Sequence, residues 1–171
     1  NLRHFSISEN DLRSLPLCID QWKHLEHLDV SKNRLNDIPE EIGDLIYLEV
    51  LNLEFSGILK LPTRIGDLVR LKHLNAASNR LTTLPDAIGR CQQLTHLNLQ
   101  FNAALTELPY AVSTLTQLEY LNLRRTGLKK LPQDMSRLQN LRYLDLRKTD
   151  LSDAEIDRVK QQLHSDCVVK G

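Results

Sequence analysis

The feature that most constrains this chain is a short leucine pattern that returns every 23 residues. The pattern is Leu-x-x-Leu-x-Leu, with Val or Ala sometimes at its last position, and a variant with Phe5 and Ile7 opens the series. One interval is 24 residues long, because the segment 102–105 contains one additional residue. A fixed period of this length indicates a repeat architecture, in which neighbouring units share one continuous core. Seven repeats begin near residues 2, 25, 48, 71, 94, 118 and 141.

Proline supports the same register. Each of the six prolines directly follows Leu or Ile at one repeat position: Pro16, Pro39, Pro62, Pro85, Pro109 and Pro132. Proline suits the first turn of a helix, where its missing N–H is no loss. Because few residues separate each proline from the next leucine pattern, each repeat is predicted to contain a strand, a turn and a short or 3₁₀ helical return.

Asparagine recurs just beyond several of the predicted strands, at Asn33, Asn79 and Asn102. Parallel strands stack about 4.8 Å apart. The stacked amides should therefore form a ladder that satisfies backbone groups buried in the turns. Hydroxyl side chains replace asparagine in three repeats and make the ladder intermittent: Ser56, Thr126 and Thr149.

These motifs resemble the leucine-rich repeat family over essentially the whole chain. A representative repeat is Leu71-x-x-Leu74-x-Ala76-x-x-Asn79-x-Leu81-x-x-Leu84-Pro85-x-x-Ile88-Gly89. This 23-residue Leu-Pro form is similar to repeats of Ras-suppressor-like and scaffold proteins and of bacterial effector-type proteins. The resemblance implies an α/β fold: a right-handed solenoid with a parallel β-sheet on its concave face and short helices or 3₁₀ turns on its convex face. It also implies a protein-binding role without specifying the partner.

We expect residues 1–171 to form a single repeat domain whose last segment, 152–171, is a C-terminal cap. Ser152 and Glu155 have the spacing of a capping box, in which both side chains satisfy the first N–H groups of a helix. Residues 166–169 are predicted to return as one more short strand. The chain begins directly in its first predicted strand, so we expect a fragment of a longer protein or a frayed first repeat.

Charge and cysteine content limit which classes of partner and which cellular compartment we expect. The 22 Lys+Arg and 22 Asp+Glu residues cancel, which argues against nucleic acid or anionic lipid as a partner. No apolar run approaches the roughly 20 residues of a membrane span. Cys18, Cys91 and Cys167 lie three repeats apart, about 14 Å, too far for disulfides. We therefore expect a cytoplasmic protein, in the producing cell or in a host cell, and a monomer unless the first strand's edge pairs.

Neither the residues nor their spacing predicts an enzyme. The chain contains no Gly-rich phosphate loop, nucleophile elbow or Cys/His cluster, so no catalytic, cofactor or metal site is expected. Neighbouring histidines such as His73 and His96 supply too few ligands for zinc, which takes three or four.

The candidate partner-binding residues lie in four columns, formed by equivalent outward-facing positions in and just after the strands. We expect all four columns to face solvent. The predicted contact residues are His73, His96, Tyr120 and Tyr143 in the first column, Asn75, Asn98 and Asn122 in the second, Gln100, Arg124 and Arg147 in the third, and Phe55, Phe101, Arg125 and Lys148 in the fourth.

Within this set the phenylalanines and the cations carry the functional hypothesis. Exposed Phe55 and Phe101 are costly unless a partner covers them, although each could instead pack over its own turn. The four cations of repeats six and seven could select an acidic segment of a protein partner, or form a solvated patch without a role. We interpret the chain as a protein–protein interaction module. The alternatives are a substrate-recruiting arm of a larger effector or signalling enzyme, and an architectural solenoid without a specific ligand.

Overall fold

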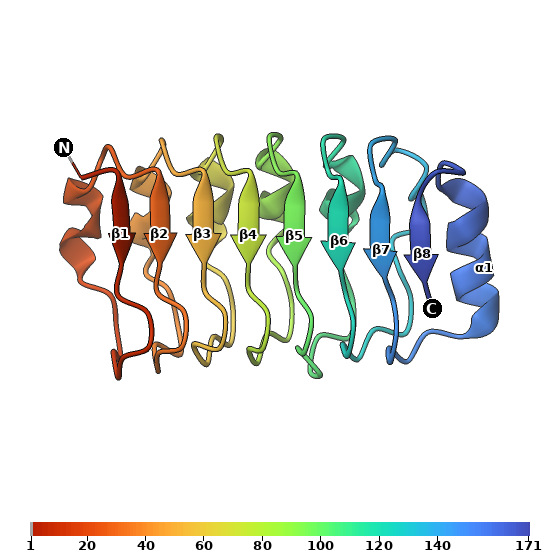
Figure 1. Cartoon of the computed structure of the whole chain (residues 1–171), viewed down its shortest axis with the longest axis horizontal. Coiled ribbons are helices and arrows are strands. Elements are labelled where there is room, and N and C mark those ends of the chain that lie inside the picture. The colour runs from red at the N-terminus through yellow and green to blue at the C-terminus, as the bar shows by residue number, and fades with distance from the viewer. Residues whose placement is uncertain (1) are drawn as a thin grey trace.

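Eight parallel strands form one open sheet in the computed structural model, which describes residues 2–171 (Figure 1). Their spatial order is their order in the chain. The strands are β1 (His4–Ser6), β2 (His27–Asp29), β3 (Val50–Asn52), β4 (His73–Asn75), β5 (His96–Asn98), β6 (Tyr120–Asn122), β7 (Tyr143–Asp145) and β8 (Val168–Lys170). Equivalent repeat positions pair throughout, as in Leu51 with Leu74. The leucine register of the sequence is therefore the register of the sheet.

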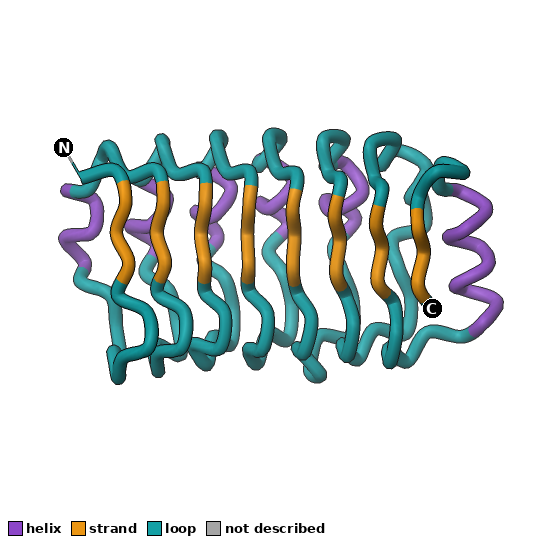
Figure 2. Tube along the Cα trace, viewed as in Figure 1, coloured by secondary structure: helices purple, strands orange, loops and turns teal. Residues whose placement is uncertain are grey.

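Short helices run along the opposite side of the molecule (Figure 2). They are the 3₁₀ helices η1 (Leu17–Gln21), η2 (Glu40–Asp44), η3 (Thr63–Asp67), η4 (Asp86–Arg90) and η5 (Tyr110–Thr114), followed by the α-helix α1 (Asp153–Gln162). Proline is the N-cap of each 3₁₀ helix; in η2, for example, the carbonyl oxygen of Pro39 accepts a hydrogen bond of 3.1 Å from the N–H of Ile42. The right-handed solenoid, with its sheet on the concave face and its short helices on the convex face, is confirmed.

The core lies between these two layers and consists of the repeated leucines and of one aliphatic residue from each 3₁₀ helix, which is isoleucine in η1 to η4 and Val112 in η5. Leu97 and Ile88, for example, have no exposed surface. Cys91 is equally buried at a leucine position, its thiol lies 3.3 Å from the carbonyl oxygen of Ile65, and burial raises its pKa to about 11. It is a free core thiol, as its repeat position predicts.

Repeat six departs from the predicted pattern. Among the described residues no helix follows Pro132, so the expectation of a helical return in this repeat is wrong. The physical reason is the adjacent cap. The N–H of Met135 donates to the Gln162 side chain of α1 (3.0 Å), and Arg158 and Gln162 donate to carbonyl oxygens of the same segment. Side chains of α1 thus satisfy backbone groups that a 3₁₀ helix satisfies elsewhere.

The cap itself is partly as predicted. Ser152 Oγ accepts a hydrogen bond from the N–H of Glu155 at the start of α1 (3.3 Å), but the Glu155 carboxylate does not return to Ser152. It accepts instead from the N–H of Leu131 (2.9 Å) and from Arg158. The second half of the predicted capping box is therefore wrong, because Glu155 joins the cap to repeat six. The predicted final strand is confirmed as β8, which pairs with β7.

The asparagine ladder is confirmed at its three asparagines. Asn79 Oδ1 accepts from the N–H groups of Ser56 (3.1 Å) and Ile58 (2.9 Å), and its Nδ2 contacts three backbone carbonyl oxygens. Asn33 and Asn102 make equivalent bonds. The hydroxyls that replace asparagine donate only to carbonyl oxygens: Ser56, Thr126 and Thr149.

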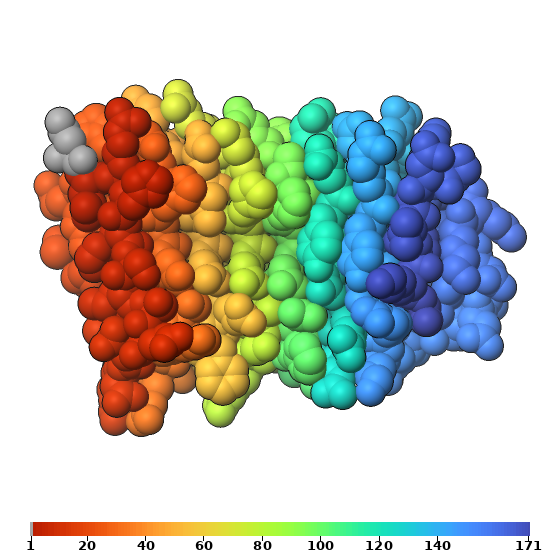
Figure 3. Space-filling view, viewed as in Figure 1, coloured from red at the N-terminus to blue at the C-terminus, as the bar shows by residue number. Residues whose placement is uncertain are grey.

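The first repeat is folded rather than frayed in residues 4–6, where β1 pairs with β2. The Phe5 ring packs against Trp22, with centroids 4.8 Å apart. Side chains from all repeats then form one continuous surface over the sheet (Figure 3). This surface is where the predicted contact residues lie.

Candidate functional site on the concave sheet

The first outward column is an array of stacked rings over four strands, β4 to β7. The ring centroids of His73 and His96 are 4.5 Å apart, those of His96 and Tyr120 5.7 Å, and those of Tyr120 and Tyr143 5.0 Å. Lys170 of β8 extends the array, with its Nζ 5.3 Å from the Tyr143 centroid. We call these four rings the aromatic column. Its rings are held by strand register, so the surface is ordered before any partner arrives.

His73, at one end of the aromatic column, has a lowered pKa. Burial, followed by the nearby charge of a protonated His96, lowers the pKa of His73. A second stacked pair, His4 and His27, has centroids 4.3 Å apart and is separated from the aromatic column by Val50. No group of three or more His, Cys, Asp or Glu residues within 2–171 is arranged to hold a metal ion.

The second column does not face solvent throughout, contrary to the prediction for all four columns. Asn122 is only 5% exposed, because its Nδ2 donates to the side-chain oxygens of Gln100 (3.2 Å) and Tyr120 (3.1 Å). In β7 the equivalent Asp145 is 1% exposed. These two side chains support their neighbours on the sheet. Asn75 and Asn98 of the same column remain partly exposed, and each accepts a hydrogen bond from a backbone N–H just beyond its own strand.

The fourth column has a backbone feature that the sequence did not reveal. All seven of its residues have positive φ angles between 52° and 59°: Glu9, Lys32, Phe55, Ser78, Phe101, Arg125 and Lys148. We call this row the left-handed ridge, since each residue has the left-handed conformation that turns the chain away from its strand. Phe55 of this ridge is 66% exposed and Phe101 is 38% exposed.

Phe101 is the centre of a cationic cluster. The guanidinium carbons of Arg125 and Arg124 lie 5.0 Å and 5.9 Å from its ring centroid, within the range of cation–π attraction. Arg124 Nε is buried and has no hydrogen-bond partner among residues 2–171. Phe101 is thus partly covered by its neighbours, whereas Phe55 projects into solvent.

Arg147 differs from the other cations of this region. Its guanidinium makes two hydrogen bonds to the Asp145 carboxylate, of 2.9 Å and 2.6 Å. Burial alone would raise the pKa of Asp145, but the hydrogen bonds from Arg147 outweigh burial and lower it. The charge of Arg147 is therefore compensated within the sheet. Arg124, Arg125 and Lys148 remain as cations without an ion pair in the described part of the chain.

Removing the Arg147 guanidinium should change how stability depends on pH. Because Asp145 has a lowered pKa when folded, its stabilising contribution is present above the unfolded value of about 3.9 and is lost as the pH falls through the folded pKa. In Arg147→Met the guanidinium hydrogen bonds are lost, so burial is opposed only by the backbone N–H of residue 147 and the Tyr143 hydroxyl, and this contribution becomes smaller. Urea unfolding should show a difference in unfolding free energy between wild type and Arg147→Met that is largest near neutral pH and shrinks in acid, with Lys148→Met as control. If the difference in unfolding free energy were the same in acid as near neutral pH, Arg147 would not be what lowers the pKa of Asp145.

Sequence reasoning placed the contact residues in columns but omitted Lys170. The register Asp145 with Lys170 could have been found by extending the column alignment into the predicted last strand. Among residues 2–171, no helix is both long enough and apolar enough to cross a membrane.

Comparison with known proteins agrees with this geometry. A family model described as a leucine-rich repeat region matches residues 17–108, which is more than half of the chain. No curated protein sequence matches significantly.

Solved structures give the same result. The leucine-rich repeat domain of the type III effector XopL is similar at 26% identity and a TM-score of 0.72, over 99% of this chain and 68% of that one. The plant peptide hormone receptor RGFR1, solved in complex with RGF2, is similar at 26% identity and a TM-score of 0.74, over 99% and 32%. An internalin (inlF) from Listeria monocytogenes shares the fold at 19% identity and a TM-score of 0.75, over 95% and 46%. The chain spans about two thirds of the effector domain and less than half of the other two. On this match and this fold, the chain belongs to the leucine-rich repeat family.

Proposed function

We propose that this chain is a protein-binding module whose partner lies on the concave sheet, over the aromatic column and the Phe101 cluster. The observation that carries the proposal is the cluster itself. Phe101, Arg124 and Arg125 combine an accessible ring with two cations, and Arg124 Nε is buried without a hydrogen-bond acceptor. A carboxylate of a partner would pair with the exposed guanidinium of Arg125 beside the ring.

The aromatic column supports the same reading. Aromatic and arginine side chains are enriched among the residues that dominate protein interfaces. Here four rings stack across β4 to β7, the strands fix their positions, and two guanidinium groups lie near the Phe101 ring beyond β5. The similar plant peptide hormone receptor RGFR1 was solved in complex with RGF2. We infer a partner protein with an acidic segment.

The free cysteines indicate the setting that we propose for this interaction. Cys18, Cys91 and Cys167 are all unpaired thiols, and Cys18 is exposed. Proteins of oxidising compartments usually pair such residues, so a reducing compartment such as the cytosol fits the chain better.

A capture experiment with two charge-matched variants tests the proposal. Phe101→Ala combined with Arg125→Glu removes the ring and reverses one cation on the concave side. Arg137→Glu makes the same charge change at an exposed arginine that donates to Tyr110 of η5 on the convex side. The amount of each protein retained by immobilised wild type should fall by about 10-fold or more with the double variant and stay unchanged with Arg137→Glu. Quantitative mass spectrometry measures both. Retention of the same proteins by all three chains would contradict the proposed surface.

A further inference from the structure

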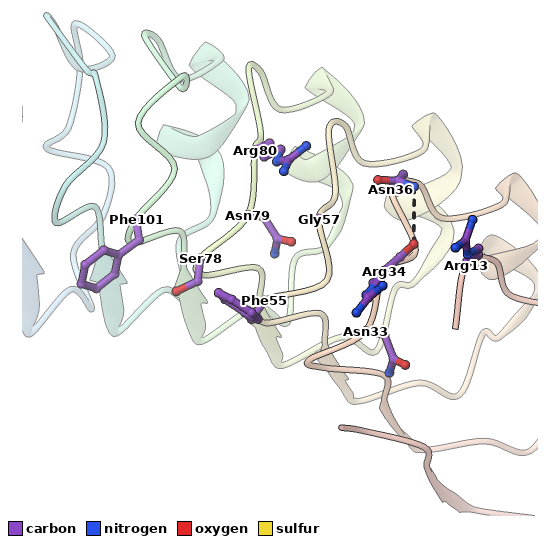
Figure 4. Close-up of a pocket in the computed structure, with 10 residues that line it drawn as sticks. All are labelled: Arg13, Asn33, Arg34, Asn36, Phe55, Gly57, Ser78, Asn79, Arg80 and Phe101. Atoms are coloured by element: carbon purple, nitrogen blue, oxygen red, sulfur yellow. Dashed lines mark hydrogen bonds between the residues drawn. The ribbon is translucent and has the colours of Figure 1, made fainter. Parts of the chain in front are cut away.

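A second surface lies outside the strands, along the edge where the chain turns toward the convex side. Here a groove of about 750 Å³ runs from Arg13 in repeat one to Phe101 in repeat five (Figure 4). Four strand spacings separate these repeats, about 19 Å, which is the length of roughly six residues of extended chain. We call this groove the edge groove. Its size and length match a short extended peptide rather than a compact small molecule.

One wall of the edge groove comes from the left-handed ridge. Phe55 and Phe101 occupy equivalent positions two repeats apart, and the small Ser78 lies between them (Figure 4). The two phenylalanines are therefore separated by two strand spacings, about 10 Å, with a gap at Ser78. The Phe55 ring points toward Ser78, whereas the Phe101 ring points away from it and lies near Arg124 and Arg125 (Figure 4). The exposed Phe55 ring beside Ser78 provides an apolar contact for a single aliphatic or aromatic side chain.

The other side of the groove is a second row of equivalent positions from successive repeats. Arg34, Gly57 and Arg80 share one repeat position, and each lies two residues beyond the left-handed ridge. Gly57 has a φ of 76° and no side chain, so it leaves a gap between the two arginines. An added Cβ there would be in ordinary contact with Asn36 Oδ1, at 3.5 Å, so it is the positive φ that favours glycine at this position.

The charge of the edge groove has one sign. Three of its lining residues are arginines and none is acidic. Arg34 pairs with Asp11 (3.0 Å), but both side chains are more than two-thirds exposed, so this pair is weak. Within residues 2–171, Arg13 and Arg80 have no ion pair. The groove therefore presents uncompensated positive charge beside exposed apolar surface.

We propose that the edge groove binds an extended acidic segment of a partner protein. One apolar side chain of the segment lies over Ser78 between Phe55 and Phe101, and carboxylates on either side pair with Arg80 and Arg34. A polyphosphate chain fits less well, because it has no apolar group to cover the exposed surface of Phe55 and Phe101. This surface is distinct from the concave interface proposed above, apart from the shared Phe101.

Fluorescence anisotropy with a defined peptide tests the assignment. The probe is a labelled heptapeptide with a central leucine and three glutamates on each side, titrated with the whole chain. Arg34→Glu with Arg80→Glu should weaken binding by about 10-fold or more, because both carboxylate contacts become repulsive. Ser78→Phe should also weaken it, because the new ring fills the gap. The backbone tolerates phenylalanine at this ridge position in repeats three and five.

The controls separate this proposal from its competitors. Arg137→Glu should bind the peptide within about 2-fold of wild type, since it makes one of the same changes on the convex side. A matched peptide with glutamines for glutamates should bind at least about 10-fold more weakly. Equal binding of the glutamine peptide, unchanged binding by the double arginine variant, or tighter binding of an oligothymidylate than of the peptide would each overturn the proposal. Because Phe101 lines both surfaces, the capture assay is repeated with Arg125→Glu alone, which leaves the lining of the edge groove unchanged, so that either proposal can fail alone.

Discussion

Replacing Asn79 with alanine should lower the free energy of unfolding by about 4 kcal/mol. The side chain is 7% exposed and is the acceptor for two buried N–H groups, those of Ser56 and Ile58. Each buried donor left without a partner costs about 1–3 kcal/mol. The carbonyl oxygens that Nδ2 contacts lose a donor as well. Urea unfolding followed by far-ultraviolet circular dichroism measures the loss.

Two further variants make this prediction specific. Ser56→Ala removes a hydroxyl that donates only to carbonyl oxygens of Val30 and Glu54, and should cost only about 1 kcal/mol. Asn79→Asp keeps the acceptor but turns an oxygen toward three carbonyl oxygens, so at neutral pH it should destabilise at least as much as Asn79→Ala. A cost for Asn79→Ala no greater than that for Ser56→Ala would show that the ladder is not a major source of stability.

Gly66→Ala should lower the free energy of unfolding by about 2–3 kcal/mol, although alanine is the better helix former. Gly66 lies in η3 against η4, and an added Cβ would come within 2.3 Å of the Ala87 carbonyl oxygen and 2.6 Å of Arg90 Nε. The oxygen belongs to the backbone, so it cannot be moved by changing a rotamer. The two helices must separate, which also strains the strands that they follow.

The equivalent position in η1 supplies the control for this prediction. Asp20 already carries a Cβ there, and its carboxylate is bonded only to the adjacent Gln21 side chain. Asp20→Ala should therefore change stability by less than about 0.5 kcal/mol. Denaturant unfolding of both variants gives the comparison. Similar costs for the two would mean that the glycine of the Ile-Gly motif is not required by helix spacing.

The fold could be predicted well because the leucine pattern marks the strands on one side and the prolines mark the helical returns on the other. The leucine spacing gave the strand register, and the prolines gave the position of the helical returns. Where prediction failed, a contact between distant elements had replaced a local one. The segment after Pro132 lacks its helix because Gln162 and Arg158, from α1, bond to its backbone. Glu155 does not bond to Ser152 for the same reason, because its carboxylate accepts a hydrogen bond from the N–H of Leu131.

The candidate site was predicted less completely. Strand alternation identified the outward columns, but it could not show that Asn122 is covered by Tyr120 and Gln100. The pairing of Arg147 with Asp145 is a two-residue spacing on one face of a strand, and could have been read from the sequence. The edge groove could not have been predicted from the sequence. It depends on small residues, Ser78 and Gly57, in different rows of the stacked repeats, and on the turn geometry that brings those rows together.

The left-handed ridge has a consequence for how such a protein can change over time. Its backbone angle is nearly constant, yet its seven side chains include one acid, three bases, a hydroxyl and two aromatic rings. A single codon change at any ridge position therefore alters what the molecule displays without requiring a new backbone. Recognition can diverge one repeat at a time while the leucines beneath stay fixed, so that new binding preferences arise without a loss of folding.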